Sequence, residues 1–149
     1  MQVISQTVIK KRPAEIWELL LNSNVDRAVY CPIFCLGAPR PVRCEHNVKD
    51  ILGEKKRRCV SNRGSIEQQI DVFEPPHHLA FHLIETDLSI KACLTSMNDD
   101  FKLESSDDGT KVIRTTDIGV TGSFQWLKLF FIWCGIKSVH RYVFKAWAA

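Results

Sequence analysis

The sequence predicts an α+β fold with one strand, two short helices, about six further strands and one long terminal helix. Three observations support this order. A β-branched run opens the chain, alternating segments separated by turn residues fill its middle, and apolar residues at three- and four-residue spacing fill its end. Strands that follow one another directly favour an antiparallel sheet of about seven strands, with helices before and after most of them.

Size and composition fit one domain over residues 1–149. The chain has 149 residues, of which 45% are hydrophobic and 25% charged. Its net charge of +3 is too small to indicate a nucleic-acid-binding protein. The longest apolar stretch, Phe124 to Ile136, falls short of the roughly 20 residues that span a bilayer, and the N-terminus lacks the apolar core of a secretion signal. We therefore expect a cytoplasmic protein without stable membrane insertion.

The first elements follow from a change in periodicity. Gln2 to Lys10 reads as a strand, and Pro13 suits the first turn of a helix, where its missing N–H costs nothing. Ile16 to Leu21 gives that helix an apolar face. A second short helix is expected from Val25 to Tyr30. It should end before Pro32, because the residue before a proline disfavours helical geometry.

Strands dominate the middle of the chain. The alternation of Leu79, Phe81 and Leu83 with less apolar residues is typical of a half-buried strand. Ser105 to Gly109 is a hairpin turn. The other expected strands are Val42–Val48, Lys55–Ser61, Ile66–Glu74, Met97–Leu103 and Lys111–Val120.

The terminal helix is expected to start at Ser123, whose hydroxyl can cap it, and to run to about Trp147. One face of this helix is apolar, and we interpret it as packing on the sheet, with part of it lining a pocket. The face consists of Trp126, Leu129, Phe130, Trp133, Ile136, His140, Val143, Phe144 and Trp147.

Three motifs occur in order along nearly the whole chain. The first is Arg12-Pro13-Ala14-Glu15-Ile16-Trp17, after the opening strand, and the third is the turn Asp108-Gly109-Thr110-Lys111-Val112. The second lies between them and comprises Gly53, Arg58, Gly64, Gln68, Glu74-Pro75-Pro76 and Leu79-Ala80-Phe81.

Together these motifs resemble the helix-grip superfamily, which includes START lipid-transfer domains, the birch-pollen-allergen carriers and the polyketide cyclase/dehydrase group. The resemblance implies a curved antiparallel sheet wrapped around the long C-terminal helix. It also implies a cavity between them that holds an apolar ligand. Gln68 stands where the superfamily often has Glu, which weakens the case for an acid or base there.

Candidate ligand-binding residues are apolar or polar side chains on faces that could line such a cavity. They are Gln68, Phe81, Asp99, Phe101, Arg114, Trp126, Phe130, Trp133 and His140. An inward charge needs a partner, and Asp99 and Arg114 are expected to pair across their hairpin. The sequence leaves open which face of that hairpin is buried, because the apolar Ile113 lies on the opposite face of the strand from Arg114.

Three functions are compatible with these patterns. The first is binding of a hydrophobic small molecule or lipid. The second is a polyketide cyclase- or dehydratase-type enzyme in the same cavity, for which Asp99, Arg114 and His140 are the only acid–base candidates. The third is a partner-binding module or homodimer that uses Phe124, Leu127, Phe131 and Ile132. No phosphate-loop, dinucleotide or hydrolase motif occurs, and no cofactor is expected.

The six cysteines are expected to be reduced, because the chain is large enough to fold without disulfides and shows no export signal. Zinc would need Cys31, Cys35, Cys44 and His46, whose spacing is poor for a zinc site. The basic runs Lys10–Arg12 and Lys55–Arg58 are interpreted as solvated faces, with attraction to an acidic ligand or membrane surface as the alternative.

Overall fold

A computed structural model of the chain describes residues 1–22, 24–25, 32–35, 38–47 and 55–149. These residues form one antiparallel sheet of seven strands in the order β1-β7-β6-β5-β4-β3-β2. The elements are β1 (Gln2–Ile9), α1 (Pro13–Leu21), α2 (Pro32–Cys35), β2 (Pro41–Asn47), β3 (Lys56–Ser61), β4 (Gly64–Glu74), β5 (His78–Thr86), η1 (Ser89–Ala92), β6 (Leu94–Ser106), β7 (Gly109–Val120) and α3 (Gln125–Ala148).

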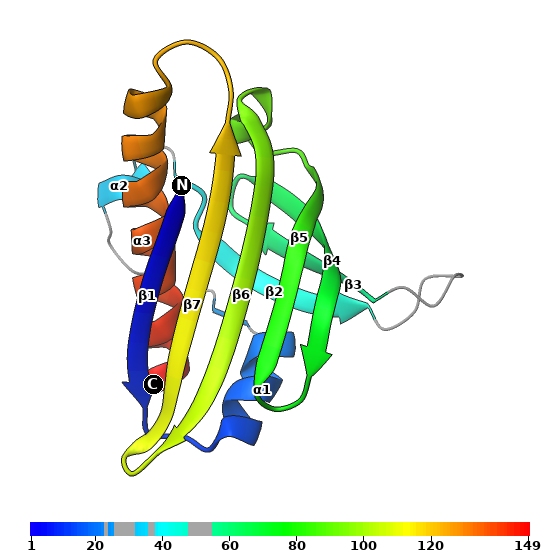
Figure 1. Ribbon diagram of the computed structural model, residues 1–149, viewed down its shortest axis with the longest axis vertical. Coiled ribbons are helices and arrows are strands. Elements are labelled where there is room, and N and C mark those ends of the chain that lie inside the picture. The colour runs from blue at the N-terminus through cyan, green and yellow to red at the C-terminus, as the bar shows by residue number, and fades with distance from the viewer. Residues whose placement is uncertain (23, 26–31, 36–37, 48–54) are drawn as a thin grey trace.

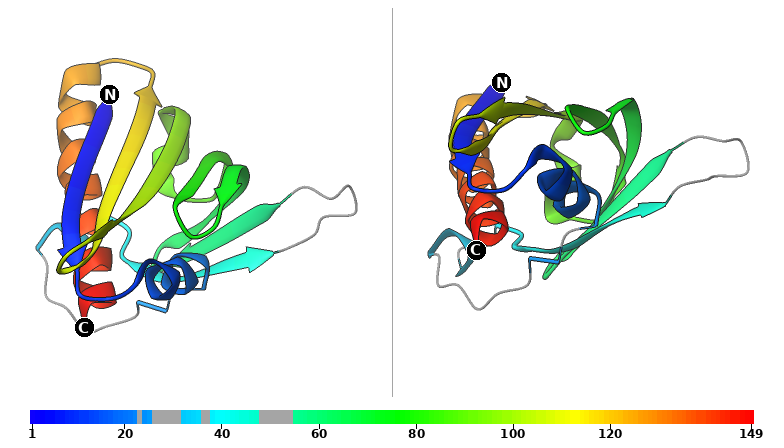
Figure 2. Two further views of the ribbon diagram at one scale, coloured as in Figure 1. Left: turned by 60° about the horizontal axis from the view of Figure 1, so that its bottom comes forward. Right: turned by 90° about the horizontal axis from the view of Figure 1, so that it is seen from below.

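The sheet curls so that its two edge strands, β1 and β2, approach the same side of the molecule (Figure 1). Helix α3 lies along β1, and α1 lies inside the curl near the end where β4 meets β5 (Figure 2). The predicted sheet and long terminal helix are therefore confirmed.

Helix α1 supplies apolar residues to the core. Pro13 occupies its first turn, and the backbone N–H of Arg12 donates to the Glu15 carboxylate at 2.8 Å. This bond and the Arg12 charge hold the pKa of Glu15 below its usual value. Ile16, Trp17 and Leu20 are buried in the main core, as their spacing predicts.

The hairpin between β6 and β7 depends on one glycine. Gly109 has a φ of +136°, which L-residues rarely adopt. A Cβ atom at this position would lie 2.2 Å from the carbonyl oxygen of Ile9. Glycine is required here because the turn crosses the end of β1 at close range.

Several boundaries differ from the sequence prediction. The helix expected from Val25 to Tyr30 falls largely outside the described residues, and α2 instead starts at Pro32. The short helix η1 between β5 and β6 was not predicted. Ser123 does not cap α3. The N-cap is Phe124, in a left-handed conformation with φ of 57° and without a side-chain cap, because the chain enters the helix through a sharp turn at Gly122 and Phe124.

The cysteines correct a second expectation. Cys44 and Cys59 form a disulfide between β2 and β3, whose register places them directly opposite. The prediction that all cysteines are reduced is wrong for this pair, while Cys93 and Cys134 are free thiols. Of the four residues considered for zinc, Cys44 is thus engaged. Cys31 and the side chains of Cys35 and His46 lie outside what the structure describes.

Candidate functional site

The inner face of β6 and β7 carries a buried ion pair. Arg114 Nε donates to Asp99 Oδ1 and Arg114 Nη2 donates to Asp99 Oδ2, each at 3.1 Å. The register sets Asp99 opposite Thr116 and Phe101 opposite Arg114, so the pair is diagonal across the ladder. Asp99 is 2% exposed. The expected pair is confirmed, and the buried face is the one that carries Asp99 and Arg114.

A chain of hydrogen bonds extends this pair through α3 to β1. Thr116 Oγ1 donates to Asp99 Oδ1, an ionised carboxylate that can only accept. The single hydroxyl proton of Thr116 is thereby used, so the 2.9 Å bond to His140 must have Nε2–H as its donor. His140 Nδ1 then accepts from the Ser5 hydroxyl at 2.9 Å. Ser5 Oγ in turn accepts from Lys137 Nζ at 3.2 Å. Donor counting therefore defines one neutral tautomer of His140.

Burial and charge determine the ionisation states of Asp99 and His140 in this hydrogen-bond network. Burial alone would raise the pKa of Asp99, but the Arg114 charge and hydrogen bonds from Arg114 and Thr116 hold it below its ordinary value. His140 is completely buried, and burial with the nearby Arg114 charge lowers its pKa to about 2. The network is therefore an ionised pair bonded through a hydroxyl to a neutral imidazole.

A second buried cation was missed by the sequence reading, which placed it in a solvated run. Arg57 of β3 is 5% exposed and donates through Nη2 to the Leu20 carbonyl at 3.0 Å, near the C-terminus of α1. Burial and the Arg114 charge lower its pKa to about 10. The available signal was alternation, because Arg57 pairs with inward Gln68 in the β3–β4 register.

A row of aromatic rings connects these charges. The ring centroids of Phe81 and Phe101 are 6.0 Å apart, and those of Phe101 and Trp147 are 5.9 Å apart. The Arg57 guanidinium lies 4.6 Å from the Phe81 ring centroid, and that of Arg114 lies 4.9 Å from the Phe101 centroid. We call Phe81, Phe101 and Trp147 the aromatic row.

Two donors beside this row have no hydrogen-bond partner. Arg57 Nε and Trp147 Nε1 are the only buried side-chain polar atoms left unpaired among the described residues. The two donors lie at opposite ends of a series of ring contacts that runs from Arg57 through Phe81 and Phe101 to Trp147. Buried donors are rarely left without an acceptor, so the hydrogen bonding of this interior is incomplete.

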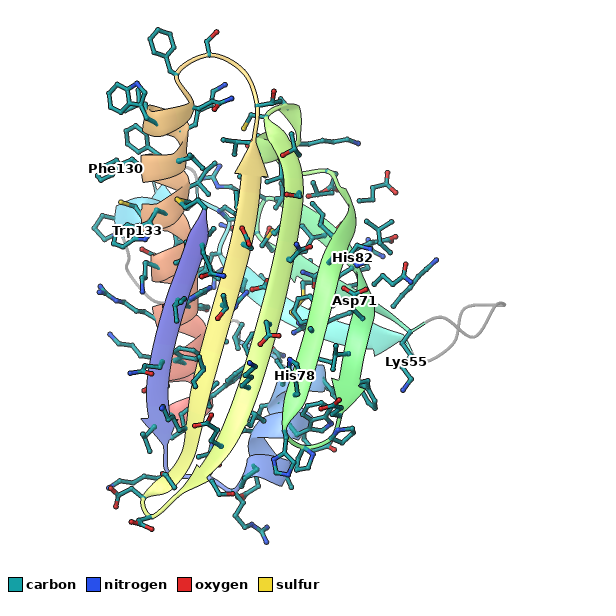
Figure 3. The ribbon with its side chains drawn as sticks, viewed as in Figure 1. Lys55, Asp71, His78, His82, Phe130 and Trp133 are labelled. Carbon is teal, nitrogen blue, oxygen red and sulfur yellow. A yellow bond between two sulfur atoms is a disulfide. The ribbon has the colours of Figure 1, made fainter. Side chains whose placement is uncertain are left out.

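The candidate residues divide into two groups. Gln68, Phe81, Asp99, Phe101 and His140 are buried, with Arg114 beside them. Trp126, Phe130 and Trp133 instead lie on the first turns of α3 with exposed fractions of 72%, 58% and 42%. Phe130 and Trp133 project from α3 away from the strands (Figure 3). The structure does not bring these three residues to the interior group.

An opening lies where β5 and β6 separate. The two strands pair only from His78 to His82 on β5, so their upper ends diverge on either side of η1. A cleft of about 400 Å³ lies between the separated strand ends. Its lining includes Leu83, which continues the inward alternation of Leu79 and Phe81, and polar Glu85, Lys91 and Ser96.

Comparison with known proteins gives matches in structure only. No family model matches the sequence, and no curated protein matches it significantly. Ara h 8.0201 superposes with a TM-score of 0.67 at 12% identity, over 99% of this chain and 95% of its own. A START superfamily protein from Mycobacterium smegmatis has a TM-score of 0.65 at 12% identity, over 99% and 94%.

A third match is the major latex-like protein 151 of Panax ginseng, with a TM-score of 0.56 at 14% identity, over 96% of this chain and 94% of its own. All three superpositions cover nearly the whole length of both chains. The fold implied by the sequence motifs is thus confirmed: this chain adopts the helix-grip fold of START-like and latex-like proteins.

Proposed function

We propose that this protein binds an apolar small molecule or lipid that carries at least one oxygen acceptor, in its interior beside the aromatic row. The observation that carries the proposal is the pair of buried, unpartnered donors, Arg57 Nε and Trp147 Nε1. Sites for small ligands combine an apolar wall with a few polar groups, and here the wall is the aromatic row with one unpaired donor at each end.

The energetics favour a ligand with an oxygen acceptor. A buried donor without a partner costs about 1–3 kcal/mol, which an acceptor on the ligand would recover. Arg57 and Arg114 supply two positive charges against the single negative charge of Asp99, since His140 is neutral. The excess positive charge favours a ligand whose oxygen is anionic or partly negative.

The cleft between β5 and β6 is the proposed route for the ligand. It is lined both by Leu83, on the inward alternation of β5, and by Ile84, which is 46% exposed. An opening lined from both faces of a sheet suits the passage of an apolar molecule from the surface to the interior.

The enzyme alternative lacks a supporting observation. Both ring nitrogens of His140 are bonded to Thr116 and Ser5, and burial moves its pKa far from neutral pH. A general acid or base works best with a pKa near the working pH and a free path to its substrate. Asp99 is likewise held by Arg114 and Thr116, so these groups are better suited to structure and binding.

The test begins with solvent extraction and mass spectrometry of the purified protein. We expect an apolar compound with a carboxylate, carbonyl or hydroxyl group, near one molecule per chain. Trp147→Phe, which removes the indole N–H, should lower its occupancy, whereas the matched change Trp17→Phe at another buried tryptophan should not.

A titration with the anionic dye 1-anilinonaphthalene-8-sulfonate provides a second readout on extracted protein. It is measured in the Trp126→Gln/Phe130→Gln background, which removes two exposed aromatic rings that could bind dye at the surface. Trp147→Phe should weaken dye binding about tenfold, the value of one good hydrogen bond. A protein that yields no compound and binds no dye would contradict the proposed function.

A further inference from the structure

The first turns of α3 expose an unusual amount of aromatic surface. Phe124, Trp126, Phe130 and Phe131 are between 58% and 72% exposed. Leu127 and Trp133 are exposed at 39% and 42%. We call these six residues the aromatic end. Exposed apolar patches of this kind mark sites of interaction with proteins or membranes.

The aromatic end covers one broad face of the helix, wider than a single stripe. Successive helical residues are about 100° apart, so Trp126, Phe130, Leu127 and Phe131 spread over roughly 140° of the helix surface. A narrow groove would cover only part of this face. A lipid surface that admits the end of the helix covers the whole face at once.

Charge distinguishes lipid from a second copy of the chain. Residues 118–149 contain the four cations Lys128, Lys137, Arg141 and Lys145 and no aspartate or glutamate. Two copies packed through α3 would bring these cations together, which is unfavourable. Anionic lipid headgroups would attract them.

The position of this region also suits contact with a flat surface. The aromatic end, the β7–α3 connection and η1 lie at one end of the molecule (Figure 1). Thr121 N–H donates to the Cys93 carbonyl at 2.8 Å and ties the connection to the segment after η1. Lys91 of η1 is exposed there, and the half-buried Lys128 of α3 donates to the Thr121 carbonyl at 3.3 Å in the same region.

We infer that the aromatic end of α3 docks this protein on anionic phospholipid membranes. Tryptophan and phenylalanine favour the boundary between headgroups and acyl chains, and nearby lysines add attraction to anionic lipid. Among the described residues no helix is long and apolar enough to cross a membrane. This inference does not depend on the interior ligand site.

The experiment is co-sedimentation of the purified protein with vesicles of phosphatidylcholine, alone or mixed with phosphatidylserine. We expect binding to the mixed vesicles that weakens as salt is added, and much weaker binding to phosphatidylcholine alone. Trp126→Gln/Phe130→Gln should reduce binding at least about tenfold, because two interfacial rings are lost. Lys128→Gln should weaken binding to the mixed vesicles only.

The matched control replaces two exposed apolar residues outside the aromatic end. Ile4 and Val8 on β1 are 52% and 51% exposed, and Ile4→Thr/Val8→Thr should bind vesicles like the parent chain. The inference is overturned if the parent chain does not bind mixed vesicles, or if the control variant loses as much binding as the aromatic variant. It is also overturned if the parent chain is a dimer that Trp126→Gln/Phe130→Gln converts to monomer, since the surface would then serve a second copy.

Discussion

The two halves of α3 have similar sequence patterns and opposite environments. In residues 137–148 the inward positions His140, Val143, Phe144 and Trp147 are at most 7% exposed. In residues 125–136 the same helical face carries Trp126, Phe130 and Trp133, which are between 42% and 72% exposed. Periodicity therefore defines the direction of a helical face, whereas its burial depends on the neighbours that the fold provides.

The largest difference between the halves is expected in stability. Phe144 is 7% exposed and contacts His140 and Trp147, so Phe144→Ala should lower the free energy of unfolding by about 3–5 kcal/mol. Phe130→Ala removes the same ring from the exposed half and should cost less than about 0.5 kcal/mol. Urea denaturation of both variants measures the two values. Equal losses would mean that the halves do not differ as described.

The ion pair beside the buried half should show strong coupling. In a double-mutant cycle with Asp99→Asn and Arg114→Met, we expect about 2 kcal/mol of interaction energy, because either single change leaves a buried group unpaired. The Lys111–Glu104 pair on the same hairpin is a matched control at 3.7 Å, with both side chains exposed. It should couple by less than about 1 kcal/mol. Additive effects at Asp99 and Arg114 would remove the pair from the account.

The buried half should also give the protein an acid-sensitive stability. Native His140 stays neutral because burial lowers its pKa to about 2, whereas an unfolded histidine takes up a proton near its ordinary value of 6.5. The unfolded state thus binds more protons below that pH, and stability falls as pH decreases. The loss of unfolding free energy due to His140 is absent above pH 6.5 and reaches about 2 kcal/mol by pH 5.

His140→Gln should abolish that part of the pH dependence, since glutamine does not titrate. His82→Gln, at a partly exposed histidine bonded to Asp71 at 2.8 Å, should retain it. Denaturation curves at several pH values between 5 and 7 provide the comparison. An unchanged pH profile in His140→Gln would show that the imidazole is not buried as a neutral group.

Local patterns predicted much of this molecule. Alternation located the strands from Ile66 to Val120, and three–four spacing located α3. The Asp99–Arg114 pair could be predicted because both residues lie on one hairpin, where the turn fixes the register. These features depend on neighbours close in sequence.

Features that depend on distant neighbours were missed. Arg57 is buried where the end of α1 presents the Leu20 carbonyl to it, which the composition of a basic run does not indicate. The disulfide requires the β2–β3 register to align Cys44 with Cys59. The exposure of Trp126 depends on how far the curled sheet covers α3, and no local pattern contains that information.

Hydrogen–deuterium exchange along α3 tests most directly the claim that one helix has a core half and a membrane half. Without vesicles, amides of residues 137–148 should exchange more slowly than those of residues 125–134, because tertiary packing protects only the former. Vesicles containing phosphatidylserine should then slow exchange within residues 124–134 and leave residues 137–148 unchanged. Uniform protection along α3 without vesicles, or a vesicle effect that is absent or centred on residues 137–148, would contradict the account.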